Sequence, residues 1–424
     1  MKEHDRGVTR AWVLHPDIKS DRDRRVAGPA LDEAVALAAA LPDLEVVGSE
    51  IVPLPKPHAG HLFGTGKIEE LKARIEAAEV ELVLVDGPVS PVQQRNLEKK
   101  WGVKLLDRTG LILEIFSDRA ATREGVLQVE MAALSYQRTR LVRAWTHLER
   151  QRGGLGFVGG PGETQIEADR RAIDEQLVRL RRQLDKVVKT RELHRKARAK
   201  VPYPIVALVG YTNAGKSTLF NRLTGAEVMA KDMLFATLDP TMRAVKLANG
   251  LDVILSDTVG FISDLPTELV AAFRATLEEV LAADLIVHVR DISHDNTEEQ
   301  AEDVRGILKS LKVSEETPQI EVWNKVDLLE PQARDAARTR AEREPDILAL
   351  SALTGEGLPQ FLETVKQRLE TETTVETLVL PFDQGHRRAW LFERGLVEEE
   401  RETEDGFALT VRWSEQQKRT FETV

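Results

Sequence analysis

The sequence contains no cysteine. This absence excludes disulfide scaffolds, cysteine-ligated zinc, iron–sulfur clusters and thiol nucleophiles. Long hydrophobic runs are also missing. The N-terminal segment lacks the apolar stretch of a secretory signal, and no run approaches the roughly 18 apolar residues of a membrane span. We therefore expect a cytoplasmic protein with no membrane span.

Positive charge is in deficit, because 59 Lys and Arg stand against 70 Asp and Glu, for a net charge of −11. Over the whole chain this balance argues weakly against a nucleic-acid partner, unless the charge is unevenly distributed. The composition, with 42% hydrophobic and 30% charged residues, is that of an ordered globular protein. At roughly 150 residues per domain, the length of 424 residues suggests about three domains.

Residues 1–118 alternate between two kinds of segment. Runs of apolar and β-branched residues predict strands at 11–16, 45–49, 81–86 and 103–107. Runs with helical character predict helices at 30–41, 67–79 and 91–101. Because strands that alternate with helices are typical of a parallel sheet, we expect a small parallel α/β subdomain.

Residues 119–200 carry two runs of apolar residues with heptad spacing, interrupted in the first run by Arg138. The runs comprise Leu127, Met131, Leu134, Leu141, Trp145 and Leu148, then Ile173, Leu177, Leu180, Leu184 and Val187. Between them, residues 151–162 contain six glycines. We expect a long antiparallel helical hairpin with a Gly-rich loop. The alternatives are two separate bundle helices and one kinked helix, which the glycines disfavour.

Residues 201–370 alternate between strand and helix again, with six predicted strands. A tight Asn-Gly turn at 249–250 joins two of them, so that pair forms a hairpin and one strand is antiparallel. Residues 371–424 contain two strand-like segments around the acidic segment 398–405, which reads as a turn. We expect a small α+β domain there.

The segment 210–217, GYTNAGKS, follows an apolar strand and precedes a helix, which is the context of a phosphate-binding P-loop. Gly210 and Gly215 let the backbone wrap the phosphates at a helix N-terminus. Lys216 is expected to reach the β- and γ-phosphates, and Ser217 to offer its hydroxyl to Mg²⁺. The other expected contacts in this loop are Tyr211, Thr212, Asn213 and Ala214.

Three further motifs follow in order, each after an apolar strand. Asp257 is expected near the magnesium ion, and the Gly260 N–H near the γ-phosphate. The Asp327 carboxylate can accept hydrogen bonds from the N1–H and amino group of guanine, which adenine does not offer. Each motif alone is also compatible with an ordinary turn, but together with the P-loop they predict a Ras-like P-loop GTPase domain. The motifs are Asp257-Thr258-Val259-Gly260, Asn324-Lys325-Val326-Asp327 and Ser351-Ala352-Leu353, whose backbone N–H suits the guanine carbonyl.

The segment 234–241, LFATLDPT, lies where a switch should form. We expect Thr237 to place the second hydroxyl on Mg²⁺, since it can pull the segment inward only when a γ-phosphate is present. Thr241 is the alternative. Catalysis is expected to rest on Lys216, Thr237 and Gly260. Further nucleotide contacts expected in this segment are Phe235, Ala236, Leu238 and Asp239.

Two positions bear on the rate of hydrolysis. Asn213 suits a monovalent cation such as K⁺ beside the phosphates, although an asparagine also stabilises turns. Phe261 stands where Ras-type GTPases carry a glutamine that orients the attacking water. Because phenylalanine has no hydrogen-bonding group, we expect slow intrinsic hydrolysis that a large partner accelerates.

The motifs GYTNAGKST, FATLDPT, DTVGF and NKVD resemble those of the HflX branch of the translation-factor-related GTPases, close to the Obg group. The helical segments 127–154 and 156–171, and FGTGKIEEL at 63–71, are similar to the same family. The resemblance covers residues 10–370 well and the acidic tail loosely. It implies binding to the large ribosomal subunit and splitting of stalled or idle ribosomes under stress. It also implies that the hairpin and its glycine loop reach into the functional centre of the subunit.

Some members of this family use ATP or unwind RNA through the N-terminal domain. Here the one candidate for such a site is Gly64-Thr65-Gly66-Lys67, which lacks the P-loop spacing. A Gly-rich helix start is the simpler interpretation of this segment.

Positive charge is concentrated in the hairpin. Residues 135–200 hold 17 Lys and Arg against 8 Asp and Glu, a net charge of +9 that leaves −20 for the rest of the chain. Such a surface can bind phosphates, and exposed rings can stack on unpaired bases. A solvated helix face is the plainer alternative. The expected rRNA contacts are Arg150, Arg152, Phe157, Arg170 and Arg171.

Our main hypothesis is a monomeric, Mg²⁺-dependent GTP hydrolase. It would act as a molecular switch that binds the large ribosomal subunit and promotes ribosome splitting or rescue under stress. The alternative is a GTP-regulated RNA-remodelling or ribosome-assembly protein whose N-terminal half acts on rRNA.

Overall fold

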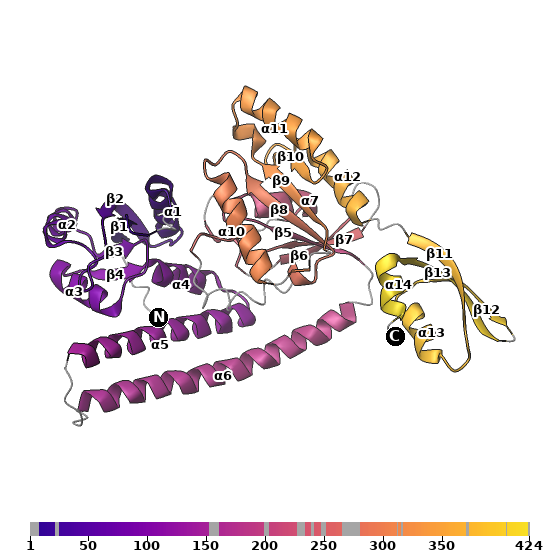
Figure 1. The fold of residues 1–424 in the computed structure, drawn as a ribbon, viewed down its shortest axis with the longest axis horizontal. Coiled ribbons are helices and arrows are strands. Elements are labelled where there is room, and N and C mark those ends of the chain that lie inside the picture. Colours follow the sequence, from indigo (N-terminus) through magenta and orange to yellow (C-terminus); the bar gives the residue numbers. More distant parts are fainter. Residues whose placement is uncertain are drawn as a thin grey trace.

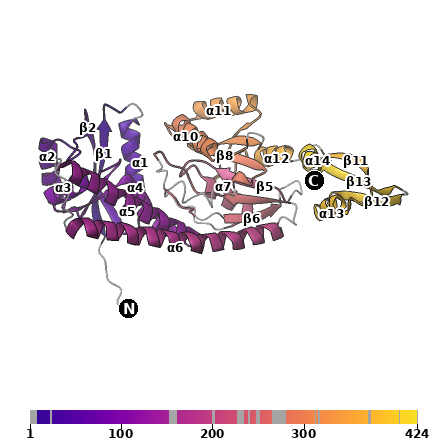
Figure 2. The same cartoon turned by 60° about the horizontal axis from the view of Figure 1, so that its bottom comes forward.

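The computed structural model describes residues 8–21, 25–151, 161–198, 203–226, 234–238, 241–246, 252–264, 280–311, 313–314, 317–369, 373–403 and 405–422. Its three sheets lie in a row, and a long helical hairpin runs beneath the first two (Figure 1). Figure 2 shows the same arrangement, with the N-terminal and C-terminal sheets at opposite ends of the molecule. The predicted fold class, a set of α/β and α+β parts joined by a hairpin, is confirmed.

The N-terminal part is a four-stranded parallel sheet, as predicted, and its strand order is β2-β1-β3-β4. Its helix α4 is missing from the sequence-based prediction. This helix begins directly after β4, where the Asp107 carboxylate accepts the Gly110 N–H at 2.8 Å. Residues 111–116 are buried on nearly every side, so they show no helical periodicity. The elements are β1 (Thr9–Ile18), α1 (Ala27–Ala39), β2 (Leu44–Leu54), α2 (Thr65–Ala77), β3 (Leu82–Val85), α3 (Pro91–Trp101), β4 (Lys104–Asp107) and α4 (Arg108–Arg119).

The hairpin consists of α5 (Arg123–Gln151) and α6 (Pro161–Arg198), which lie side by side (Figure 1). An ion pair of 2.8 Å between Arg138 and Asp174 joins them. Leu127 and Leu180, one from each apolar seam, are buried. The antiparallel hairpin is thus confirmed, and the single kinked helix is wrong. Most of the Gly-rich loop, 152–160, lies outside the described residues.

The third part is a six-stranded sheet of order β10-β9-β8-β5-β7-β6. Its strands are parallel except β6, which pairs with β7 in antiparallel fashion, as the Asn-Gly turn predicts. The described elements are β5 (Ile205–Val209), α7 (Lys216–Thr224), β6 (Thr241–Lys246), β7 (Asp252–Asp257), β8 (Leu285–Asp291), α10 (Thr297–Ser310), β9 (Gln319–Asn324), η1 (Val326–Leu328), α11 (Pro331–Arg343), β10 (Ile347–Ala349) and α12 (Leu358–Leu369).

The C-terminal part is a three-stranded antiparallel sheet of order β11-β13-β12. The acidic segment, predicted as a turn, is largely the strand β12. It pairs with β13 on one side only, and its side chains are mostly exposed, so the sheet tolerates its charges. The elements are β11 (Thr373–Leu380), α13 (Gly385–Glu393), β12 (Val397–Thr403), β13 (Gly406–Ser414) and α14 (Glu415–Glu422).

One apolar cluster joins the first three parts of the molecule. Phe116 of α4 packs edge-on against Phe235 of the predicted switch, with ring centroids 4.7 Å apart. Phe261, which follows Gly260, is buried in the same cluster, as is Val129 of α5. The segments expected to sense the nucleotide therefore share a core with the N-terminal sheet and the hairpin.

Candidate functional site

The P-loop connects β5 to α7, and its two flanking glycines have conformations that other residues rarely adopt. Gly210 has φ +153°, and a Cβ there would lie 2.1 Å from the Val289 carbonyl oxygen. Gly215 has φ +91°, and a Cβ there would lie 2.2 Å from the Asn324 amide nitrogen. Both contacts are shorter than any real Cβ contact, so the loop requires glycine at each position.

The buried side chain of Lys216 folds over the inside of this loop. Its Nζ donates to the carbonyl oxygens of Gly210 at 3.1 Å and Tyr211 at 2.8 Å. Burial lowers the pKa of Lys216 to about 8, and the nearby Asp257 carboxylate opposes the shift.

Two hydroxyls converge on Asp257. Ser217 Oγ donates to Asp257 Oδ2 at 2.7 Å, and Thr237 Oγ1 donates to the same oxygen at 2.9 Å. The two hydroxyl oxygens are 2.9 Å apart. Burial raises the pKa of Asp257, although Lys216 and both hydroxyls favour the charged form. Its second oxygen, Oδ1, is buried and has no hydrogen-bond partner among the described residues.

The segment that follows Asp257 is tied to the P-loop by its backbone. The Thr212 N–H donates to the Phe261 carbonyl oxygen at 2.7 Å, and the Phe261 N–H donates to Gly210 O at 3.1 Å. A Cβ on Gly260 would lie 2.8 Å from Thr212 Cα and 3.1 Å from Lys216 Nζ. Gly260 therefore faces the groups expected around the γ-phosphate.

A small cavity of about 50 Å³ lies between the P-loop and the switch segment. Its lining includes Thr218, for which no role was predicted, and most of the predicted phosphate and magnesium contacts: Thr212, Asn213, Gly215, Lys216, Ser217, Phe235, Ala236, Thr237, Thr258 and Gly260. Leu238 is buried in the apolar cluster instead, and Val259 is buried with it. Asp239 lies outside the described residues. The alternative magnesium ligand Thr241 begins β6, opposite Asp257 in the antiparallel pair.

The motifs expected to hold the base are joined by Asn324. Its amide donates to the Ala214 carbonyl oxygen at 2.8 Å and accepts the Ala352 N–H at 2.9 Å. Lys325 pairs with Asp291 at 2.8 Å. Asp327 keeps one buried carboxylate oxygen, Oδ1, without a partner among the described residues. Of the other expected contacts, Val326 and Ser351 are buried and Leu353 is exposed.

Tyr211 carries a contact that the sequence did not reveal. Its phenol donates to the Glu33 carboxylate on α1 and accepts the Ser263 N–H at 2.7 Å. Arg108 at the start of α4 donates to Glu33 at 2.7 Å and to the Ser263 carbonyl oxygen at 2.8 Å. These bonds connect the P-loop and the segment after Gly260 to the N-terminal sheet.

A buried ion cluster supports this connection from the N-terminal side. Asp86 accepts hydrogen bonds from Arg108 at 2.6 Å and Arg25 at 2.9 Å, and its carboxylate lies 2.8 Å from a His15 ring nitrogen. Burial disfavours the charged carboxylate, but His15 and the two guanidinium groups outweigh it and hold the pKa of Asp86 at about 2. No local sequence pattern indicates this cluster, because its members come from four separate segments.

The segment 64–67 is a helix start, as the simpler interpretation predicts. Gly64 is the N-cap residue of α2. The ammonium group of Lys67 forms ion pairs with Glu50 and Glu70. It is therefore engaged on the surface of its own subdomain.

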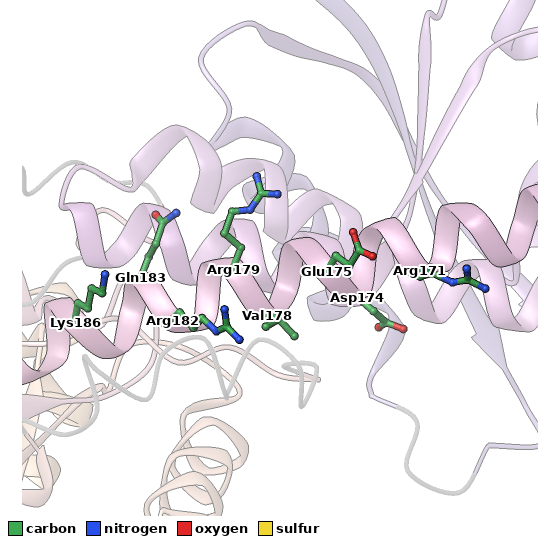
Figure 3. Close-up of a pocket in the computed structure, with 8 residues that line it drawn as sticks. All are labelled: Arg171, Asp174, Glu175, Val178, Arg179, Arg182, Gln183 and Lys186. Carbon is green, nitrogen blue, oxygen red and sulfur yellow. The ribbon is translucent and has the colours of Figure 1, made fainter.

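The basic hairpin presents a groove of about 610 Å³ along α6 (Figure 3). Four basic side chains line it together with two acidic ones: Arg171, Arg179, Arg182 and Lys186, with Asp174 and Glu175. Of the residues expected to contact rRNA, Arg171 lines this groove, and the neighbouring Arg170 is exposed and 3.9 Å from Asp174. Arg150 lies in α5. Arg152 and Phe157 lie outside the described residues.

A P-loop, a hydroxyl pair on a strand-terminal aspartate and a base-recognition motif at one edge of a mostly parallel sheet define a P-loop GTPase. Four family models match the chain: GTP-binding GTPase N-terminal (29–117), GTP-binding GTPase Middle Region (119–198), 50S ribosome-binding GTPase (205–325) and HflX C-terminal domain (336–423). The chain belongs to the HflX family of GTPases. No helix in the described ranges is long and apolar enough to cross a membrane.

Relatives align over most of the chain. GTPase HflX of Magnetococcus marinus is 49% identical over 94% of this chain and 90% of the relative. GTPase HflX of Escherichia coli is 45% identical over 88% of this chain and 86% of the relative. Among solved structures, a GTP-binding protein of Sulfolobus solfataricus in complex with GDP is similar at 22% identity and a TM-score of 0.46, covering 85% of this chain and 98% of that one.

Proposed function

We propose that this GTPase is a Mg²⁺-dependent molecular switch that binds the large ribosomal subunit and promotes ribosome splitting or rescue under stress. The proposed role as a switch is supported by the shared apolar cluster, which contains Phe116, Val129, Phe235 and Phe261. A change in position of either nucleotide-sensing segment alters the packing against the N-terminal sheet and α5. Because packed cores have discrete arrangements, such a change can be transmitted to the hairpin.

The residues present fit a magnesium ion. Mg²⁺ prefers oxygen ligands and retains several waters. Ser217 and Thr237 supply hydroxyl oxygens, and Asp257 adds a carboxylate with one buried oxygen lacking a partner among the described residues. When bound, the ion neutralises the charge that develops on the β- and γ-phosphates. The protein contributes the placement of these oxygens.

The predicted nucleotide contacts complete the proposed site. Lys216 and the Gly260 N–H would meet the γ-phosphate, and Asp327 would read guanine. Asn213 lines the cavity at a positive φ of 58° and is the residue we propose for a K⁺ ion.

Large-subunit binding is supported by two features. The residues 205–325 match a family described as 50S ribosome-binding GTPases. The α6 groove adds four basic side chains on a long exposed helix, which suits the phosphates of rRNA. We propose a monomer that meets the subunit with this hairpin.

Sedimentation with purified large subunits tests the proposal. The protein would be compared in GTP analogue, GDP and ATP analogue, and we expect the strongest binding with the GTP analogue.

Replacing both Arg171 and Arg179 by Glu tests the role of the hairpin, and this double variant should bind more weakly. The slope of the logarithm of its binding constant against the logarithm of the salt concentration should fall by roughly one per lost phosphate contact. Arg401→Glu, whose side chain is 80% exposed on β12, is the matched control. Unchanged binding of the double variant would contradict the role of the hairpin.

A further inference from the structure

Thr212 in the P-loop has a buried hydroxyl that the site described above does not use. The residue is 6% exposed, and its Oγ1 is buried with no hydrogen-bond partner in the part of the chain that the structure describes. Leaving a buried hydroxyl unpaired is unfavourable, and folded proteins rarely do so. Thr212 lines the cavity between the P-loop and the switch segment. Its hydroxyl therefore suits a group that enters this cavity.

Four other polar side chains of this cavity have hydrogen-bond partners. Lys216 bonds to two carbonyl oxygens of the loop, and Thr258 Oγ1 donates to Leu208 O at 2.7 Å. Ser217 and Thr237 are hydrogen-bonded to Asp257. Thr212 differs from all four in its lack of a described partner.

The position of Thr212 relates it to the γ-phosphate. A Cβ on Gly260 would touch Thr212 Cα and Cγ2, each at 2.8 Å, and Lys216 Nζ at 3.1 Å. Gly260 and Lys216 are the two groups proposed above to meet the γ-phosphate. Thr212 therefore lies next to Gly260, on the side of Gly260 that also faces Lys216 Nζ.

The usual water-orienting position has no polar group here. Phe261 is 1% exposed, and its ring packs in the apolar cluster with Tyr211, Phe235 and Val259. A side chain that points into the core cannot hydrogen-bond to a water in the cavity. Another group must orient the attacking water if hydrolysis occurs without a partner.

We propose that Thr212 is a further catalytic residue, whose hydroxyl accepts a hydrogen bond from the attacking water and donates to a γ-phosphoryl oxygen. The proposal rests on the placement of GTP in the P-loop proposed above. The water oxygen forms a bond to the γ-phosphorus, and the bond from this phosphorus to the bridging oxygen breaks. GDP leaves with that electron pair on its terminal oxygen, and both protons of the attacking water stay on the released phosphate, which forms as H₂PO₄⁻. Thr212 begins and ends as a neutral hydroxyl, so its contribution is orientation.

Single-turnover GTP hydrolysis by the full-length protein tests this role. Thr212→Val keeps the shape of the side chain and removes the hydroxyl, Thr212→Ala removes it without adding bulk, and Thr212→Ser keeps it. We expect the first two variants to be roughly 10- to 100-fold slower, and the serine variant to stay within about threefold of the native rate. GDP affinity should stay within about threefold in all three, because GDP has no γ-phosphate.

Two results would overturn the proposal. One is a native hydrolysis rate in both Thr212→Val and Thr212→Ala. The other is a serine variant as slow as the valine variant, because the hydroxyl would then not be the group that matters. Failure of the native protein to bind GDP would instead refute the placement of the nucleotide on which the proposal rests, and GDP binding is therefore measured first.

Discussion

The phenol of Tyr211 hydrogen-bonds to the carboxylate of Glu33 although 178 residues separate them in sequence. One partner lies in the P-loop and the other on a helix of the N-terminal sheet. Burial raises the pKa of Tyr211 well above its ordinary value, and the charge of Glu33 adds to the shift. The phenol therefore stays a hydrogen-bond donor at any pH at which the protein is used.

Tyr211→Phe should destabilise the protein by about 1–3 kcal/mol, because Glu33 loses a donor and the Ser263 N–H loses its acceptor. Equilibrium unfolding in urea measures the effect. Tyr203→Phe is the matched control, since Tyr203 is 40% exposed, and it should change the free energy of unfolding by less than about 0.5 kcal/mol. Equal effects of the two substitutions would contradict a role for this contact.

Thr237→Ala, which removes the hydroxyl proposed to bind Mg²⁺, should slow Mg²⁺-dependent GTP hydrolysis by roughly 100-fold. This hydroxyl is hydrogen-bonded to Asp257 and lies next to the Ser217 hydroxyl. Thr241→Ala serves as the control, because Thr241 pairs with Asp257 through the strand backbone. It should stay within a few-fold of the native rate. Hydrolysis would be followed over a magnesium titration. A larger loss in the Thr241 variant would reassign the magnesium ligand.

Asp327→Asn should reverse the preference for the base. An amide nitrogen would face the N1–H of guanine, donor against donor, and GTP affinity should fall by about 100-fold or more. Xanthine carries a carbonyl oxygen in place of the amino group, so a xanthine nucleotide should bind the variant better than GTP does. Competition binding measures both affinities. Asp335→Asn on α11, where the side chain is 76% exposed, should change neither.

K⁺ should stimulate hydrolysis relative to Na⁺ if Asn213 holds a monovalent cation. Asn213→Ala should then hydrolyse GTP at the same rate in either salt. The comparison is made at constant ionic strength, so that screening does not differ. Equal rates of the native protein in both salts would leave Asn213 with the role of stabilising its turn.

Acid should destabilise the six-stranded sheet through His288 on β8. Burial lowers the pKa of His288 to about 4, although Glu321 opposes the shift. Below pH 6.5 His288 binds a proton in the unfolded chain, whereas in the folded protein it stays neutral until the pH reaches about 4. The free energy of unfolding therefore falls as pH drops through this window, by roughly 1 kcal/mol per pH unit.

Unfolding of His288→Leu measured between pH 7 and 4.5 checks this expectation. The variant should show a flatter pH dependence than the native protein. His386→Gln on α13, where the residue is exposed, should leave the dependence unchanged. A native slope in the His288 variant would assign the acid sensitivity to other groups.

The sequence predicted the parts of this protein whose information is local. The P-loop residues 210–217 and the motif 257–260 are contiguous, and their structural context is a strand and a helix next to them. The heptad seams of α5 and α6 depend only on residue spacing. Thr237 is predicted as a magnesium ligand because a switch segment must lie between the P-loop and that motif, and its hydroxyl donates to Asp257.

The parts that escaped prediction depend on contacts between distant segments. Glu33, Arg108 and Ser263 show no pattern that pairs them with Tyr211. Residues 111–116 lose their helical periodicity because neighbours surround them on nearly every side. The charges of β12 conceal a strand, since an edge strand with exposed side chains needs few apolar residues. Tertiary burial, rather than local preference, decides each of these cases.

The shared apolar cluster holds one end of α5 against the segments expected to sense the nucleotide. Val129 is held in that cluster, and α5 continues to Gln151, about 33 Å further along at 1.5 Å per residue. A rotation of about 10° at the cluster displaces the far end of α5 by roughly 6 Å. A small change in the packing of the cluster can thus become a much larger movement at the far end of α5. The length of α5 therefore sets how far a change at the nucleotide-sensing segments would move the far end of the hairpin.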